Sequence, residues 1–196
     1  MILGLLLAAL TALPALAQTP EGAHPAIGRL NHAGFRERMH CTVSLVGPRE
    51  ALTAAHCVAG LPPEALHVLL GYDRGEYAEH LRVRSAHLAP GADIARLCLD
   101  GASAAPPFAQ GAAAPGPVAM IGYPRSRAHR QRRRDCALRA SDGTQARIDC
   151  AVEPGMSGAP VLAQGRVVGV MSATSAETSL AALVAALPPG GCDPPA

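Results

Sequence analysis

Residues 153–161 read Glu153-Pro154-Gly155-Met156-Ser157-Gly158-Ala159-Pro160-Val161, with a serine between two glycines just ahead of an apolar segment. Gly155 and Gly158 allow the backbone to turn sharply and to approach a substrate without a Cβ in the way. The N–H groups of Gly155 and Ser157 can then point together at a developing oxyanion. Glycine and serine are also the commonest turn residues, so this stretch alone indicates only a turn.

Two upstream stretches favour Ser157 as a nucleophile. His56 lies in Leu52-Thr53-Ala54-Ala55-His56-Cys57, and Asp93 begins Asp93-Ile94-Ala95-Arg96-Leu97. Histidine, then aspartate, then serine is the chain order of one known arrangement of the catalytic triad.

The amino-terminal residues 1–17 have the pattern of a signal peptide. Residues 2–12 are apolar, and the small residues Ala15-Leu16-Ala17 form a cleavage site. A membrane anchor, the competing interpretation, needs about twenty apolar residues, and this run stops short. We therefore predict a secreted or periplasmic protein without a membrane segment.

All six cysteines lie outside the signal segment and enter an oxidising compartment, where an even number implies disulfides. Zinc is the alternative, because His40-Cys41 and His56-Cys57 form two His-Cys pairs. The spacing fits no structural zinc site, and no C-x-x-C occurs. We therefore expect disulfides and no metal.

The formal net charge is +2, too small to suggest a charged partner, and all 17 basic residues are arginine. Six of them fall in the ten residues Arg125–Arg134. A patch for nucleic acid or an anionic surface is one interpretation. Because no aromatic residue is interleaved and a hairpin is expected here, we favour a solvated loop, a possible self-cleavage site, and no nucleic-acid partner.

Short β-branched or alternating segments with Gly and Pro between them predict an all-β sandwich or barrel. In the first half these segments are 25–30, 41–46, 51–54, 66–70, 81–86 and 94–99. An uncharged Ala/Gly/Pro-rich linker follows at 101–117. In the second half they are 118–124, 135–139, 146–152, 159–162 and 167–172. Residues 180–187 suit either a closing strand or a short helix.

With these features the chain resembles the chymotrypsin/trypsin-like serine endopeptidases, most of all their compact bacterial secreted members. LTAAHC (52–57), DIA (93–95) and a GxSGxP stretch (155–160) occur in this order in that family, and TAAHC is the most specific. The resemblance covers residues 26–187.

The resemblance implies an all-β fold of two packed antiparallel β-barrels with the active site in the cleft between them. The expected organisation is an N-terminal barrel in 18–104, with a leader at 18–25, then a linker at 105–116. The C-terminal barrel and tail then occupy 117–196.

The resemblance also gives roles to the triad. Ser157 matches the nucleophile, His56 the general base and Asp93 the acid that orients the imidazole. Asp73 and Asp100 are nearby alternatives, but only Asp93 precedes an apolar run that can bury it. Gly155 and Ser157 would supply the oxyanion hole, and no cofactor is needed.

The cysteines fit the family's bridges. Cys41 with Cys57 resembles the bridge that holds the histidine strand, and Cys136 with Cys150 would join two strands that lead to the nucleophile. These two pairs leave Cys98 with Cys192, which would tie the tail to the first barrel.

Three positions match the family's substrate-binding strand and pocket. Ser172 matches the serine that faces the catalytic acid. Ala151 stands where Arg/Lys-specific members carry an acid, and Met171 where glutamate-specific members carry a histidine. The absence of a charged pocket indicates a preference for small or apolar side chains, unless Asp149 or Glu153 reaches the pocket through a loop shifted by two residues.

Met156 departs from the animal digestive members, which place an acid there to pair with a newly cut amino terminus. We therefore expect a monomeric endopeptidase that is competent once its signal peptide is removed and that acts on polypeptides. The main alternative is a catalytically silent, protease-like binding protein. An esterase or lipase fits less well because those enzymes place Ser before Asp and His, and a binding module built on the arginine run is the remaining option.

Overall fold

The computed structural model describes residues 22–32 and 40–192. The predicted signal peptide at 1–17 and the first half of the predicted leader at 18–25 lie outside these residues. No helix in the described part of the chain is long and apolar enough to cross a membrane.

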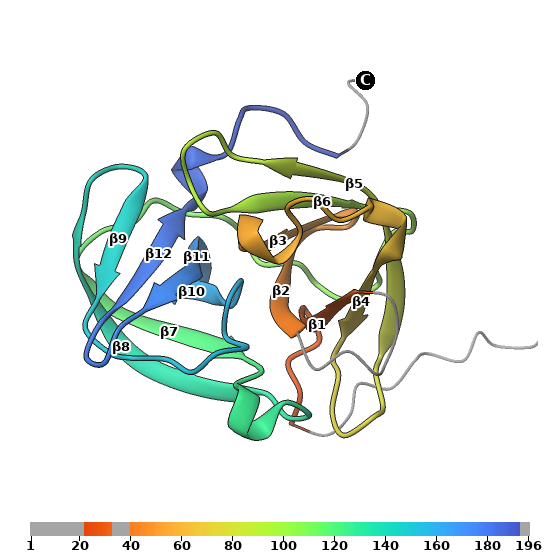
Figure 1. Ribbon diagram of the computed structural model, residues 1–196, viewed down its shortest axis with the longest axis horizontal. Helices are drawn as coiled ribbons and strands as arrows, with labels where there is room; N and C mark the ends of the chain where they lie inside the picture. Colours follow the sequence, from red (N-terminus) through yellow and green to blue (C-terminus); the bar gives the residue numbers. More distant parts are fainter. Residues whose placement is uncertain (1–21, 33–39, 193–196) are drawn as a thin grey trace, which may run out of the picture.

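Two closed antiparallel barrels of six strands each make up the molecule, as the resemblance implies (Figure 1). The first barrel closes in the order β1-β2-β3-β6-β5-β4. Its strands are β1 (Ile27–His32), β2 (His40–Gly47), β3 (Glu50–Thr53), β4 (Leu66–Leu70), β5 (Glu79–Leu88) and β6 (Ala95–Leu99).

The second barrel closes in the order β10-β11-β12-β9-β8-β7. Its strands are β7 (Gly116–Gly122), β8 (Arg132–Ser141), β9 (Gln145–Ile148), β10 (Pro160–Ala163), β11 (Arg166–Thr174) and β12 (Ser179–Leu183). Four short 3-10 turns complete the described secondary structure: η1 (Ala55–Cys57), η2 (Pro63–Ala65), η3 (Arg125–Arg127) and η4 (Val184–Ala186).

Strand alternation shows how the sequence builds a barrel with a second buried face. In β4 the side chains of Leu66, Val68 and Leu70 join the core cluster inside the first barrel. Leu69 points the other way, as the period of two requires, and packs with Tyr72 and Tyr123 between the barrels. The outward face of this strand is therefore also apolar where the second barrel covers it.

The segment between β6 and β7 joins the two barrels without forming a strand of its own. The Phe108 N–H donates to the Leu45 carbonyl at 3.0 Å, and the Gly111 N–H donates to the Val167 carbonyl at 2.9 Å. The Phe108 ring contacts the clusters between the barrels. The predicted linker at 105–116 thus runs along one barrel and then the other.

Both ends of the described chain reach across to the opposite barrel. Near the amino end, the His24 N–H donates to Gln131 Oε1 at 2.8 Å, and Gln131 Nε2 donates to the Ile27 carbonyl at 3.1 Å. Near the carboxyl end, the Cys98–Cys192 disulfide ties the tail to β6 of the first barrel.

All six cysteines are paired, in the combinations that the resemblance implies. The other two disulfides are Cys41–Cys57, between β2 and η1, and Cys136–Cys150, between β8 and the segment after β9.

One of the local predictions needs correction. Arg132–Arg134 are not loop but the start of β8, because Arg132 pairs with Gly122 and Arg134 with Met120 across the ladder. Residues 180–187 divide between β12 and η4. The arginines of this block are nevertheless all exposed, as expected.

We expect the Cys98–Cys192 bridge to contribute more stability than Cys136–Cys150, because it closes a separation of 94 residues rather than 14. Loop entropy predicts a loss of about 4–5 kcal/mol for Cys98→Ala with Cys192→Ala, against about 3 kcal/mol for the Cys136/Cys150 pair. Urea unfolding followed by circular dichroism measures both. Equal losses, or the reverse order, would contradict this expectation.

Candidate active site

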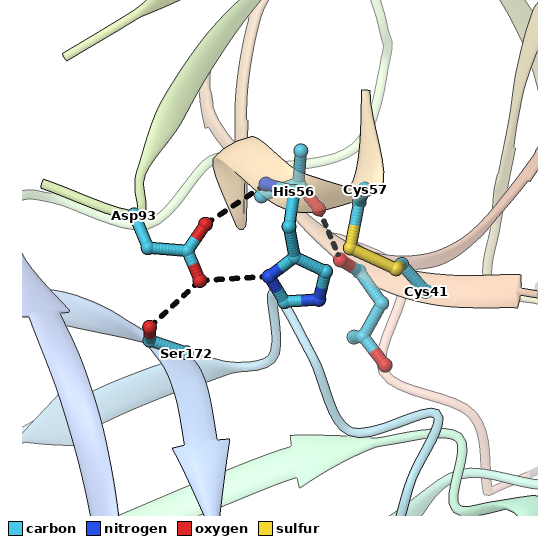
Figure 2. A network of polar contacts seen from close by, with 7 residues as sticks. Cys41, His56, Cys57, Asp93 and Ser172 are labelled. Atoms are coloured by element: carbon cyan, nitrogen blue, oxygen red, sulfur yellow. Dashed lines mark hydrogen bonds and ion pairs between the residues drawn. A yellow bond between two sulfur atoms is a disulfide. The ribbon is translucent and has the colours of Figure 1, made fainter. Parts of the chain in front are cut away.

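His56 and Asp93 meet at the edge of the first barrel. His56 Nδ1 lies 2.7 Å from Asp93 Oδ2, and the His56 backbone N–H donates to Asp93 Oδ1 at 2.8 Å. The Ser172 hydroxyl from β11 donates to Asp93 Oδ2 at 2.7 Å. Figure 2 shows Asp93 and Ser172 on one side of the imidazole and the Cys41–Cys57 disulfide on the other.

Local structure explains why these side chains are held in place. His56 lies in η1, and the last residue of this turn, Cys57, is fixed to β2 by its disulfide. Asp93 directly precedes Ile94, which is fully buried between the barrels. The Ala89 N–H donates to the Ile94 carbonyl at 2.9 Å and closes the turn that presents Asp93.

The two other candidate acids lie elsewhere. The Asp73 carboxylate pairs with Arg74 at 3.0 Å and with Arg130 at 3.5 Å. Asp100 lies just beyond the far end of β6, where its backbone N–H donates to the Arg82 carbonyl at 3.0 Å. Of the three aspartates, only Asp93 contacts His56.

Ser157 lies in the connection between β9 and β10, and this connection is bound to the first barrel. The Thr42 N–H of β2 donates to the Ser157 carbonyl at 2.8 Å. The Thr42 hydroxyl donates to the Gly155 carbonyl at 3.0 Å and accepts from the Tyr123 N–H at 3.1 Å. One buried threonine thus fixes the serine loop from the opposite barrel.

Gly155 and Gly158, expected to allow a sharp turn, both have a left-handed backbone, with φ of 93° and 80°. A Cβ on Gly158 would collide with the Thr42 carbonyl and the Thr53 hydroxyl. A Cβ on Gly155 would collide with the Tyr123 carbonyl. Glycine is required at both positions by conformation and by space.

The backbone N–H groups of Gly155 and Ser157 donate to no other group among the described residues. Both residues line a cavity of about 420 Å³ together with His56 and the Cys41–Cys57 disulfide. No hydrogen bond between Ser157 and His56 occurs within the described residues. The two unused donors, the hydroxyl and the imidazole therefore share one open space.

His40 supports this loop from the side. Burial lowers the pKa of His40 below its usual value, and Nε2 contacts the Tyr123 carbonyl at 2.8 Å. Since a carbonyl only accepts, Nε2 carries the proton. Tyr123 also donates its own hydroxyl to the Tyr72 carbonyl at 2.9 Å, so its ring and backbone connect the two barrels.

The predicted pocket residues Met171 and Ala151 do not line the cavity that contains His56 and Ser157. Met171 is 1% exposed and packs in the core of the second barrel, so its side chain does not line the open site. Ala151 lines a different cavity, beside Met156. Neither acidic alternative is free: the Asp149 carboxylate accepts from the Ala137 N–H at 2.6 Å, and Glu153 accepts from the Ser126 N–H at 3.3 Å.

One group of potential metal ligands is close together in the described part of the chain: Cys41, His56 and Cys57. Because both sulfurs are consumed in a disulfide, only the imidazole could bind an ion. The zinc interpretation of the His-Cys pairs finds no support there.

The sequence matches the family of trypsin-like peptidase domains over residues 41–170, more than half of the chain. The chain belongs to this family. Its two barrels and the order of its motifs agree with this membership. The three disulfides together with the family indicate an extracellular or secreted protein.

Coagulation factor XII of Cavia porcellus is 41% identical to this chain over 68 residues. That match covers 34% of the chain and only 11% of factor XII. Among solved structures, the Vibrio cholerae VesB protease has a TM-score of 0.69 at 18% identity and covers 83% of this chain and 61% of its own. The scabies mite inactivated protease paralogue S-D1 has a TM-score of 0.71 at 14% identity, with 82% and 88% covered. At these identities the structural likeness concerns the fold alone.

Sequence reasoning missed the residues that hold the serine loop, namely Thr42, Tyr123 and His40. Thr42 is separated from Ser157 by most of the chain, and nothing in its local sequence marks the contact. The available signal was indirect: a glycine with no room for a Cβ, such as Gly158, requires a close neighbour.

We expect Gly158→Ala to destabilise the protein by about 2–5 kcal/mol, because a left-handed alanine costs about 1–2 kcal/mol and the overlap of its methyl group with the Thr42 carbonyl adds about 1–3 kcal/mol. Gly143→Ala is the matched control: its φ is 95°, but no atom lies within 4 Å of the new Cβ. The control should lose only about 1–2 kcal/mol, the cost of a left-handed alanine. Urea unfolding measures both, and equal losses would show that the contact with the first barrel does not constrain Gly158.

Proposed function

We propose that this trypsin-like peptidase is a secreted serine endopeptidase with Ser157 as nucleophile, His56 as general base and Asp93 as orienting acid. The observation that carries the proposal is the pair of contacts between the Asp93 carboxylate and His56. One carboxylate oxygen accepts from the His56 backbone and the other contacts Nδ1. Among the described residues Nε2 has no hydrogen-bond partner, and His56 lines the same cavity as Ser157.

The proposed reaction begins with attack of Ser157 Oγ on the scissile carbonyl carbon, while the hydroxyl proton moves to His56 Nε2. Asp93 accepts the Nδ1 proton in a hydrogen bond, so Nε2 holds the lone pair that this transfer needs. The resulting imidazolium is stabilised by the carboxylate, whose side chain is 28% exposed.

The unpaired N–H groups of Gly155 and Ser157 would stabilise the oxyanion of the tetrahedral intermediate. Collapse of that intermediate breaks the C–N bond, and His56 gives its proton to the leaving amine. Water then attacks the acyl-enzyme by the same route and regenerates Ser157. Ser172 would act through Asp93, whose Oδ2 it binds, rather than on the substrate.

A catalytically silent binding protein remains the second candidate, because an inactivated protease paralogue has the same fold. The contacts of His56 favour the active form. A silent protein has no need for an aspartate that binds both the backbone N–H and Nδ1 of the histidine. Met156 is 3% exposed and packs in the core of the second barrel, so an apolar contact supports the serine loop where animal digestive members use an ion pair.

We expect a fluorophosphonate serine probe to label the folded protein at Ser157 alone. Ser157→Ala should abolish labelling, whereas Ser141→Ala, at an exposed position at the end of β8, should leave it unchanged. Intact-mass analysis followed by peptide mapping measures the stoichiometry and the site. No labelling of a disulfide-intact sample would move the binding-protein candidate ahead.

We expect Asp93→Asn to lower kcat by a factor on the order of 10⁴ with little change in KM. The asparagine amide would donate to Nδ1 and leave the proton on Nε2, where it blocks transfer from the serine. Asp100→Asn is the control, because Asp100 is exposed and lies away from His56. Steady-state kinetics on a chromogenic ester substrate measure both, and a similar loss in the two variants would contradict the assignment of Asp93.

A further inference from the structure

Four exposed arginines of η3 and β8 form a positive surface beside the serine loop. We call Arg125, Arg127, Arg132 and Arg134 the arginine surface. None of their guanidinium groups lies within 4.0 Å of a carboxylate in the described residues. The two other arginines of the block do have partners: Arg130 contacts Asp73 at 3.5 Å, and Arg133 contacts Asp135 at 2.8 Å.

The arginine surface adjoins the candidate active site on both sides of the serine loop. Arg125 lines the cavity of about 420 Å³ that also contains His56 and Ser157. The other three arginines line a second cavity, of about 340 Å³, with Glu153 and Met156 in its wall. Residues 153–157 therefore separate the two cavities, and an extended ligand that enters the first can reach the second.

Hydrogen bonds hold the backbone of the segments that carry these arginines. The Arg125 N–H donates to the Pro154 carbonyl at 2.7 Å, which ties the start of η3 to the serine loop. Arg132 and Arg134 belong to the ladder between β8 and β7. Because the backbone is already ordered, a ligand would need to order only the side chains.

The two sides of His56 suggest which part of a polypeptide would reach this surface. Ser172 and β11 lie on one side of the imidazole and the Cys41–Cys57 disulfide on the other (Figure 2). If the acyl part of the substrate pairs with β11, the leaving-group part passes over the disulfide into the cavity that Arg125 lines.

We propose that the arginine surface binds acidic side chains of a polypeptide substrate on the carboxyl-terminal side of the cleaved bond. This inference rests on the proposed endopeptidase function and adds a substrate class to it. Guanidinium groups form paired hydrogen bonds with carboxylates, which an ammonium cannot match. In the part of the chain that the structure describes, Glu153 is the one carboxylate lining the second cavity, and its hydrogen bond from the Ser126 N–H holds it to the wall.

A polypeptide fits this surface better than a nucleic acid does. Single strands bind by stacking bases on aromatic side chains over a basic groove. No Phe or Tyr of the described residues lines either cavity. The arginines also lie next to the groups that would cut a peptide bond.

Binding to the full-length Ser157→Ala protein tests the inference without using activity. The ligands are fluorescent peptides with the same amino-terminal half, followed by either four Glu or four Gln, and a single-stranded oligonucleotide with four phosphates. At 0.01 M salt, where the Debye length is about 30 Å, we expect the Glu peptide to bind roughly tenfold tighter than the Gln peptide. That advantage should disappear at 0.5 M salt.

Paired variants locate the effect. Arg127→Gln with Arg134→Gln should remove most of the advantage of the Glu peptide, whereas Arg127→Lys with Arg134→Lys should keep part of it. Arg82→Gln with Arg147→Gln, which removes the same charge from exposed positions on β5 and β9, should leave the advantage intact. Circular dichroism confirms the folding of each variant.

Three results would overturn the inference: equal binding of the Glu and Gln peptides, an advantage that both double Gln variants reduce equally, or tighter binding of the oligonucleotide than of the Glu peptide. The last would indicate a nucleic-acid surface. Fluorophosphonate labelling of the wild type reports separately on the endopeptidase, so failure of either proposal can be recognised without the other.

Discussion

The hydrogen bonds of Thr42 to the serine loop are the constraint on which the site depends. Thr42 is fully buried in β2, so each of its polar atoms must find a partner within the protein. Its N–H and hydroxyl bind Ser157 and Gly155, and its carbonyl accepts from Thr53 at 2.8 Å. The loop that carries the serine in one barrel is therefore held by β2 of the other barrel, the strand that the Cys41–Cys57 disulfide joins to the histidine turn. A shift of one barrel against the other would leave these groups unpaired.

The order of the motifs correctly predicted which polar side chains meet within the first barrel. LTAAHC and DIA predicted that His56 and Asp93 would meet, and apolar alternation predicted Leu66–Leu70 to the residue. The two-barrel fold came from the resemblance rather than from the pattern, which alone allowed a sandwich or a barrel.

The features that sequence reasoning missed depend on long-range packing. The strand predicted at 135–139 begins earlier, because β8 starts with three exposed arginines that have no apolar alternation, and their pairing with β7 makes them part of the strand. Met171 stands where the resemblance suggested a pocket residue, yet the alternation of β11 turns its side chain into the core. Contacts such as Thr42 with Ser157 join distant parts of the chain and leave no local pattern.

Each end of the described chain is bound to the opposite barrel, and this arrangement affects how the protein unfolds. Residues near His24 are held by Gln131 of the second barrel, and the tail after β12 is fastened to the first barrel through Cys192. Each barrel is thus bound by a terminal segment that belongs, by sequence, to the other half of the chain. Separating the barrels would break both the hydrogen bond between His24 and Gln131 and the attachment of the tail through Cys192. We therefore expect the two barrels to unfold as one cooperative unit, even after cleavage of the segment that joins them.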